Sequence, residues 1–453
     1  MRKHVAMVLG LILLASTLYG CGQKTEESAP ASDTGKAEAP AQTEEKGTDD
    51  SAGAVDKPYE GTEIRVIFAN HNWTDAVTAH LDEFTEKTGI VVKAENYAED
   101  QLSEKLAIEL TSGSSGLDVM MTRPLQEIKM FIQNGWVYDL SALKDDPEVD
   151  AADFIPSALA SYEDTSGACY GLPLVTERQI LYYRTDLFEK AGLEVPKTMD
   201  ELMAAAEKLN DPDNEVYGIV SRGLTAAAVT QFSGYLYGCG GNWVDKDGNA
   251  ALNTPEAVKA FTFYGDMLRK YGPPGVLNMH WQQAAALYSQ GNAAMYTDAD
   301  SLYNSACGPD STVSDVTGYA VMPTGAVYNI CSWGMSIAAN TKNPEASMEF
   351  VKWATSKEVS TLTQSAGNSG ARTSVWDDPE ANKNFPPELV KVILASGDIG
   401  VETDRPQVIS VGRARDAIGE VIVTAINGGD VQAAADKANA TFQSIIDEDF
   451  GTK

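Results

Sequence analysis

Short apolar segments of two kinds alternate along the chain from Tyr59 onwards, and this alternation limits the folds open to it. The run 63–69 is β-branched and aromatic, as in a buried strand. The run 74–88 repeats its apolar residues at helical spacing. Strand-like segments at 90–94 and 118–121 then flank a helical pattern at 102–110. Strands that alternate with helices predict an α/β fold built on parallel strands and crossover helices.

The same pattern continues to the end of the chain. A strand-like segment occupies 180–184, and 293–297 reads as another strand. Helical patterns are present at 199–209, 255–271, 343–353, 414–426 and 431–447. The segment 59–453 is too long for one compact core, so it predicts two lobes of ordinary domain size.

The first 21 residues have the form of a bacterial export signal. A basic start precedes an apolar run at 5–18, which is too short to span a bilayer and predicts a removable signal peptide at 1–20. The run ends at Gly-Cys21, which resembles the lipobox of bacterial lipoproteins and implies a lipid on Cys21. Residues 21–58 contain no aromatic side chain and predict a disordered tether. The alternative is a plain secretory signal with an incidental cysteine.

The remaining cysteines are Cys169, Cys239, Cys307 and Cys331. In an exported chain they could form two disulfides, with three possible pairings, but free buried thiols are the simpler interpretation and the one we prefer. No CxxC spacing and no Cys/His cluster is present, so the sequence predicts no metal site and no cofactor.

The net charge of −31 predicts repulsion from nucleic acids and from anionic lipid surfaces. We therefore expect no nucleic-acid partner, although the charge does not identify a neutral ligand. The chain contains no GxSxG, HExxH or Walker pattern. Aspartate and glutamate are too abundant for a pair of glycosidase carboxylates to stand out.

A series of segments in a fixed order resembles the sugar-binding group of the extracellular solute-binding proteins of ABC importers, the group that includes maltose-binding protein. The segments are 84–92, 118–119, 135–140, 170–177, 181–188, 196–202, 291–295 and 342–346. No single segment is specific, but the ordered set is, and the resemblance extends over nearly all of 60–446 in the family's order.

The resemblance implies a two-lobed periplasmic-binding-protein-like α/β fold, each lobe a mainly parallel sheet flanked by helices, with several hinge crossings. It places 59–175 plus 318–352 in an N-terminal lobe and 176–317 plus 353–453 in a C-terminal lobe. A ligand would bind in the cleft at the carboxyl ends of the strands, and the lobes would close over it.

The implied function is that of a non-enzymatic, lipid-anchored subunit on the extracytoplasmic face of the cell membrane. It would capture a mono- or oligosaccharide as a monomer and deliver it to ABC permease subunits and, through them, to an ATPase. An exported glycoside hydrolase, or an ABC-type binding protein for a non-sugar solute, is the alternative.

A sugar site needs flat aromatic side chains for ring faces and planar polar groups for hydroxyls. The loop Asn70-His71-Asn72-Trp73 supplies both kinds directly after the first strand. The further candidates are Arg123 after the third strand, Glu177 at the position of a ligand-contacting glutamate of the family, Trp243 after a Gly-rich segment, Asp298 at a strand end, Trp333 between small residues, and Arg372 and Arg413 in segments that the family often points at the cleft.

Each candidate has a structural alternative. Trp73 could pack on the core, Arg123 could form a surface ion pair, and Glu177 could pair with its neighbour Arg178. Trp281 precedes a helix and is interpreted as lobe packing. The family's aromatic residue near position 415 is absent here, which weighs against a maltodextrin ligand.

Overall fold

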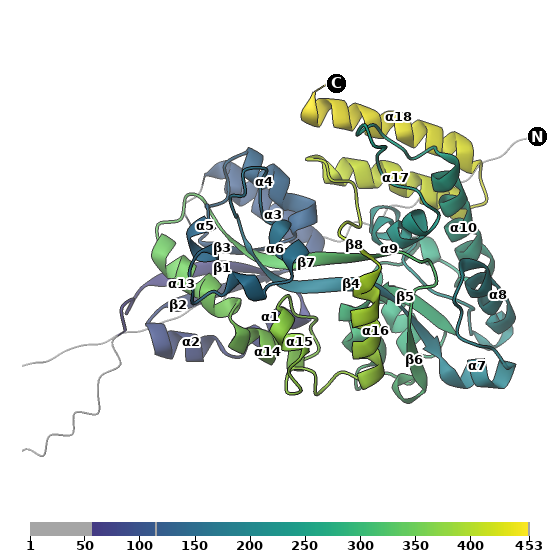
Figure 1. Cartoon of the computed structure of the whole chain (residues 1–453), viewed down its shortest axis with the longest axis horizontal. Coiled ribbons are helices and arrows are strands. Elements are labelled where there is room, and N and C mark those ends of the chain that lie inside the picture. The colour runs from purple at the N-terminus through teal and green to yellow at the C-terminus, as the bar shows by residue number, and fades with distance from the viewer. Residues whose placement is uncertain (1–56, 114–115, 452–453) are drawn as a thin grey trace, which may run out of the picture. The chain divides into compact units, whose positions relative to one another are not determined.

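A computed structural model of the chain describes residues 57–113 and 116–451 (Figure 1). The predicted signal peptide, Cys21 and nearly all of the predicted tether lie outside these residues. In chain order the elements up to the first long strand are β1 (Glu63–Ala69), α1 (Asn72–Thr78), α2 (Leu81–Thr88), β2 (Val91–Tyr97), α3 (Glu99–Ser112), β3 (Val119–Thr122), the short π-helix η1 (Pro124–Ile128), α4 (Lys129–Gln133), α5 (Ser141–Lys144) and α6 (Pro156–Ala160).

Two long strands enclose the middle of the chain. The elements from the first of them to the second are β4 (Leu172–Arg184), α7 (Thr185–Ala191), α8 (Met199–Leu209), α9 (Thr225–Gly238), α10 (Pro255–Tyr271), α11 (Trp281–Ser289), β5 (Met295–Ala299), the 3₁₀ turn η5 (Asp300–Leu302), α12 (Tyr303–Cys307), β6 (Thr317–Val321) and β7 (Val327–Ile337). The chain continues through α13 (Pro344–Ala354), α14 (Lys357–Ser365), α15 (Thr373–Trp376), α16 (Pro387–Asp398), β8 (Gly400–Val401), α17 (Val411–Ile426) and α18 (Val431–Phe450).

The predicted elements are present, with one division. The helix expected at 74–88 is two helices, α1 and α2, separated at Ala79 and His80. At the end of α1 the hydroxyl of Thr78 donates to the carbonyl of Thr74 at 2.8 Å, a side-chain bond to the preceding turn that bends helices. Gly89 ends α2 with a φ of 83°, a left-handed conformation that favours glycine.

The strands form one sheet in the order β2-β1-β3-β7-β4-β5, with β6 also paired to β4. β1 is parallel to both β2 and β3. β7 is antiparallel to β3 and to β4. The carboxyl ends of β1, β2 and β3 therefore lie at one edge, where the loops that follow them meet.

Separate hydrophobic cores lie at the two ends of this sheet. The first contains Phe68, Phe131 and Phe350, and we call the elements around it the first lobe. The second contains Phe232, Phe261 and Ile422 and adjoins a smaller cluster around Tyr182 and Leu389; we call these elements the second lobe. Figure 1 shows the two groups of helices on either side of β4 and β7.

Three segments pass from one core to the other. In β4, Leu172 packs in the first core and Leu181 in the second; in β7, Val327 packs in the second and Met335 in the first. The segment from Ala371 to α15 makes the third passage. The two-lobed α/β fold with several crossings is thus confirmed.

The prediction of a mainly parallel sheet in each lobe is wrong for the second lobe. There β4 pairs antiparallel with both β5 and β6, although isolated parallel bridges join Tyr217 and Val220 to the β5 region. The reason is that β4 enters the second lobe from the first, against the direction in which β5 and β6 run.

The packing also bears on where one lobe ends. β6 belongs to the second-lobe sheet, since it pairs with β4 beside β5, whereas Ala354, Val359 and Ala371 pack in the first core. We infer that the first lobe includes these last residues, beyond the predicted limit at 352, and that the segment around β6 lies in the second lobe.

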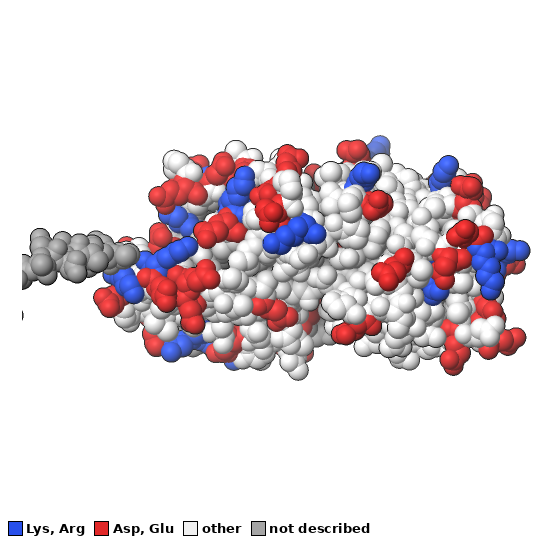
Figure 2. All heavy atoms as spheres, turned by 90° about the horizontal axis from the view of Figure 1, so that it is seen from below, with Lys and Arg blue, Asp and Glu red and all other residues white. Residues whose placement is uncertain are grey.

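No helix among the described residues is both long and apolar enough to cross a bilayer. On the face seen in Figure 2, acidic and basic side chains are interspersed, with an uncharged area between them. The four cysteines of the described part are free thiols, three of them buried.

Candidate functional site

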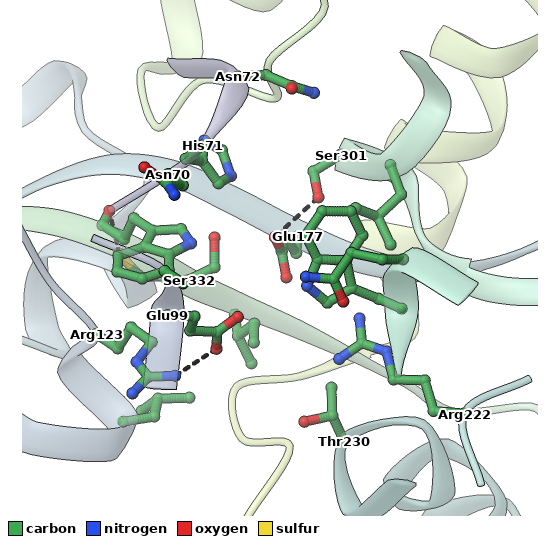
Figure 3. A pocket seen from close by; sticks show the side chains of 18 of the residues that line it. Asn70, His71, Asn72, Glu99, Arg123, Glu177, Arg222, Thr230, Ser301 and Ser332 are labelled. Atoms are coloured by element: carbon green, nitrogen blue, oxygen red, sulfur yellow. Dashed lines mark hydrogen bonds and ion pairs between the residues drawn. The ribbon is translucent and has the colours of Figure 1, made fainter. Parts of the chain in front are cut away.

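A cavity of about 450 Å³ lies between the two lobes, beside the crossing strands β4 and β7. Figure 3 shows Arg123 and Glu99 on one side, Arg222 and Thr230 on the other, and Glu177 between them. The residues that line the cavity are Asn70, His71, Asn72, Asp75, Ala98, Glu99, Arg123, Leu125, Glu177, Arg222, Thr230, Trp281, Gln282, Ser301, Leu302, Ile330, Cys331, Ser332, Trp333 and Arg405.

The loop after β1 places three polar side chains at the cavity. Nδ1 of His71 accepts a hydrogen bond from the backbone N–H of Trp73 at 3.0 Å, so this histidine caps α1. Burial lowers the pKa of His71 to about 4. The ring is therefore neutral at physiological pH, and Nε2 carries the proton and can donate. Asn70 and Asn72 add amide groups beside it.

Arg123 follows β3 and is held by two acids of the first lobe. Nη2 donates to Oε1 of Glu127 at 2.9 Å, and Nη1 pairs with Glu99 at the start of α3. Burial alone would lower the pKa of Arg123, but the two carboxylates outweigh it and raise this pKa. The guanidinium carbon lies 5.5 Å from the centre of the Trp333 ring.

Arg222 is the corresponding cation of the second lobe. Its Nε donates to Oδ2 of Asp298 at 2.9 Å, and Nη2 donates to Oδ1. The carboxylate of Asp298 has no exposed surface. It also accepts from Nε2 of Gln231, which donates to the hydroxyl of Tyr328 as well, each at 2.8 Å. This buried network fixes the direction in which Arg222 points.

A second cation of the same lobe comes from the segment between β8 and α17. Nε of Arg405 donates to Oδ1 of Asp404 at 2.6 Å. Asp404 is fully buried and accepts from the hydroxyl of Thr230 at 2.7 Å. Arg405 and Thr230 both reach the cavity, so this pair presents donors fixed by a buried acid.

The two glutamates that face the cavity have opposite pKa shifts. Glu177 lies in the crossing part of β4 and accepts from the hydroxyl of Ser301 at 2.8 Å. Burial raises the pKa of Glu177 to about 7. Burial would also raise the pKa of Glu99, but Arg123 and further cations outweigh it and lower this pKa to about 2. Glu99 is thus a fixed anion and acceptor, whereas Glu177 titrates near neutrality.

Two tryptophans reach the cavity in different ways. Trp333 is 5% exposed, with Arg123 over its ring and the ring of His71 at 5.9 Å. Trp281, at the start of α11, is partly exposed. The earlier interpretation of Trp281 as lobe packing is therefore corrected, because its side chain lines the cavity.

The structure brings six of the predicted site residues together at the cavity. They are Asn70, His71, Asn72, Arg123, Glu177 and Trp333. Asp298 does not line the cavity but binds Arg222, which does.

Four other predicted residues lie elsewhere. Trp73 is 1% exposed and packs in the first core at 6.3 Å from the Phe68 ring, because α1 begins at once and turns this side chain inward. Trp243 is buried in the second core, where its Nε1 donates to the hydroxyl of Tyr237 at 2.7 Å. Neither tryptophan is available to a ligand in this cavity.

The two predicted arginines near the C-terminus are structural. Arg372 is buried and donates to the carbonyls of Thr355 and Val149, both at 2.7 Å, so it connects loops of the first lobe. Arg413 is exposed on α17 and pairs with Glu448 of α18 at 2.6 Å. Both predictions fail because the local sequence does not distinguish an arginine that stabilises a lobe from one that faces a cleft.

Several lining residues were missed. Arg222 comes just after the apolar pair Ile219-Val220, and Glu99 begins a helix after β2. Both positions carried a usable signal, a polar residue that closely follows a short apolar segment or a strand. Thr230 and Arg405 carried none, because a helix interior and an irregular segment bring them to the cavity only in the folded chain.

The described residues contain no cluster of histidine, cysteine and acidic side chains that could hold a metal ion. The cavity instead presents guanidinium, carboxylate, amide and hydroxyl groups, the groups that pair with hydroxyls of a small ligand.

Comparison with known proteins agrees with this architecture. The sequence pattern of the family described as bacterial extracellular solute-binding protein matches residues 70–361, more than half of the chain. The chain therefore belongs to this family. Proteins of this family are described as extracellular.

Individual relatives have names that specify ligands. The mannitol-binding protein of Pseudomonas aeruginosa is 31% identical over 274 residues, which cover 58% of this chain and 62% of that protein. A solute-binding protein of Agrobacterium radiobacter K84 in complex with ribitol is 29% identical, with a TM-score of 0.78 over 86% of this chain and all of that one. One from Agrobacterium vitis S4 with bound D-mannitol is 27% identical, with a TM-score of 0.75 over 86% of this chain and 99% of that one.

Proposed function

We propose that this protein is the substrate-binding subunit of an ABC importer and captures a small neutral polyol or monosaccharide in the cavity between its lobes. The observation that carries the proposal is the way the three cavity arginines are held. Arg123, Arg222 and Arg405 each pair with a carboxylate of the protein, so their remaining N–H groups are fixed donors without an unbalanced positive charge.

The charge balance favours a neutral ligand. The cavity is also lined by the acid Asp75, by Glu99, which is charged and pairs with Arg123, and by Glu177, which titrates near neutrality. An anionic solute would be repelled by these acids, whereas an uncharged polyol can donate hydroxyls to them and accept from the arginines.

The aromatic side chains favour a small or acyclic ligand over an oligosaccharide. Stacking of successive sugar rings needs several open aromatic faces. Here Trp333 is covered by Arg123 and nearly buried, which leaves Trp281 as the partly exposed tryptophan of the lining. The mannitol- and ribitol-binding relatives support the same choice.

The rest of the proposal follows from the family and from the N-terminal sequence. The mature protein begins at a lipidated Cys21, is tethered to the outer face of the cell membrane, and delivers its ligand as a monomer to a permease driven by an ATPase. No bond of the ligand is made or broken. Replacement of Cys21 by Ser should release the protein from membranes, and continued membrane association of the variant would contradict the anchor.

A thermal-shift and calorimetry panel tests the ligand class. D-mannitol and ribitol should raise the melting temperature, since a ligand at about 100 times its Kd stabilises the native state by about 2.7 kcal/mol, and chromatography should recover them unchanged. Maltose, maltotriose and an amino acid serve as comparisons. Stabilisation by maltotriose or the amino acid alone, or recovery of an altered polyol, would overturn the proposal.

A further inference from the structure

The two lobes are joined beside the cavity by a polar contact that the capture function alone does not require. Gln126 belongs to η1, and the nearby residues Ile128 and Phe131 pack in the first core. Its Oε1 accepts from Nη1 of Arg405 at 2.9 Å and from Nη1 of Arg415 at 3.0 Å. Both arginines belong to the second lobe.

The second-lobe side of this contact is held independently of Gln126. Arg405 remains bound to the buried carboxylate of Asp404. Arg415 lies on α17 and donates from Nε and Nη2 to the carbonyl of Ala226, at 3.0 and 2.7 Å. Separation of Gln126 from the arginines would therefore leave the second lobe internally bonded.

We propose that Gln126 is the closure latch of this protein. It is a positioning residue whose amide oxygen accepts hydrogen bonds from Arg405 and Arg415 when the lobes close. In this way it affects ligand affinity without touching the ligand. The proposal rests on the capture function above and adds a residue that affects how readily the cleft closes.

The chemistry of the contact makes the latch weak by itself. One uncharged oxygen accepts from two cations that repel each other; burial and the nearby Arg405 together lower the pKa of Arg415 to about 9. A neutral acceptor adds only a modest attraction, so the contact can form and break reversibly.

The latch is also connected to the cavity. Arg405 lines the cavity, and its Nη1 donates to Gln126. A ligand that accepts from Arg405 would hold this arginine in the position that Gln126 requires. Ligand binding and closure then favour each other, as expected when a ligand binds one of two states more tightly.

Two substitutions change the latch in opposite directions. Gln126→Met keeps the size and removes the acceptor, whereas Gln126→Glu replaces it by a carboxylate between the two cations. Gln133→Glu is the matched control, because Gln133 is exposed at the end of α4 and receives the same change of charge.

The first measurement needs no ligand. Small-angle scattering of the ligand-free, full-chain protein should give a larger radius of gyration for Gln126→Met and a smaller one for Gln126→Glu than for wild type. The decrease in radius of gyration expected for Gln126→Glu should be smaller in about 1 M NaCl, where charges are screened within a few ångströms. Gln133→Glu should scatter as wild type does.

The second measurement uses D-mannitol and ribitol as probes. We expect Kd to rise about tenfold in Gln126→Met and to fall about tenfold in Gln126→Glu. If neither alditol binds any variant, the proposed ligand class is wrong, but the scattering still tests the latch. Wild-type scattering from both Gln126 variants, or compaction of Gln126→Glu that salt does not reduce, would overturn the latch.

Discussion

The arginines on the two walls of the cavity are held by acids of different accessibility. In the first lobe, Arg123 pairs with Glu99, whose side chain is 33% exposed, and with the more deeply placed Glu127. In the second lobe, Arg222 and Arg405 each pair with an aspartate that has no exposed surface.

The comparison indicates on which wall of the cavity an acid can be substituted without loss of the fold. Arg123 keeps a carboxylate if either glutamate is replaced, because the other remains. Arg222 has its ion pair with Asp298 alone among the described residues, so its position depends on a single buried acid. We expect ligand preference to be adjustable at the first wall and fixed at the second.

Asp298→Asn should have the largest effect. The variant leaves the nearly buried Arg222 without its carboxylate, and removal of one partner of a buried ion pair costs about 3–5 kcal/mol. Urea unfolding measures the loss, with Asp416→Asn, an exposed position on α17, as the control. A loss below about 1 kcal/mol would remove the distinction between the walls.

Glu177 lies between the walls and predicts a pH dependence of stability. Burial raises the pKa of Glu177 from the ordinary 4.5 to about 7. Between these values the folded protein keeps a proton that the unfolded chain has released. The free energy of unfolding should therefore fall as pH rises through this window, by about 1–3 kcal/mol in the ligand-free protein.

The matched variant is Glu177→Gln, which stays neutral at every pH and keeps the size of the side chain. Urea titrations at several pH values should show that the variant loses the decline between pH 4.5 and 7 and exceeds wild type in stability above it. Parallel pH profiles for the two proteins would contradict the assignment. Arg222, Asp298 and Asp300 contribute charges near this group and are unchanged in both proteins.

Sequence patterns predicted the parts of the site that follow strands. The polar loop at Asn70 comes after an apolar strand, and Arg123 follows the next buried strand of the same sheet, so the parallel arrangement brings them to one edge. Glu177 came from the family resemblance, because nothing in the local sequence marks the middle of a crossing strand as a ligand site. Trp333 was predicted from the small residues on either side of it.

The remaining features depend on tertiary packing. Trp73 was expected in the cavity, but a helix that begins at Asn72 directs it into the core. Asp404 and Thr230 are far apart in the chain and meet only after α9 and the segment before α17 pack together. The direction of β5 and β6 relative to β4 likewise depends on which lobe the long strand enters from.

Glu99→Gln should have a smaller effect than either substitution above. Glu127 continues to bind Arg123, so we expect a loss of unfolding free energy of about 1 kcal/mol at neutral pH. Because the pKa of Glu99 is lowered to about 2, its contribution in wild type is present above about pH 4.5 and disappears as pH falls towards 2. Equal losses from Glu99→Gln and Asp298→Asn would show that the two walls do not differ in the way we describe.

Arg413→Ala should have the smallest effect. It tests whether Arg413 lies outside the second-lobe wall of the cavity. Its pair with Glu448 joins two side chains that are each more than half exposed, and such pairs contribute little because water screens them. We expect a change in unfolding free energy within about 0.5 kcal/mol and an unchanged Kd for D-mannitol or ribitol.

Arg405→Lys, measured beside it, keeps the charge but loses the paired geometry towards Asp404 and should weaken binding. An equal loss of affinity in the two variants would place Arg413 at the ligand after all and would mean that α17 moves towards the cavity when the protein binds.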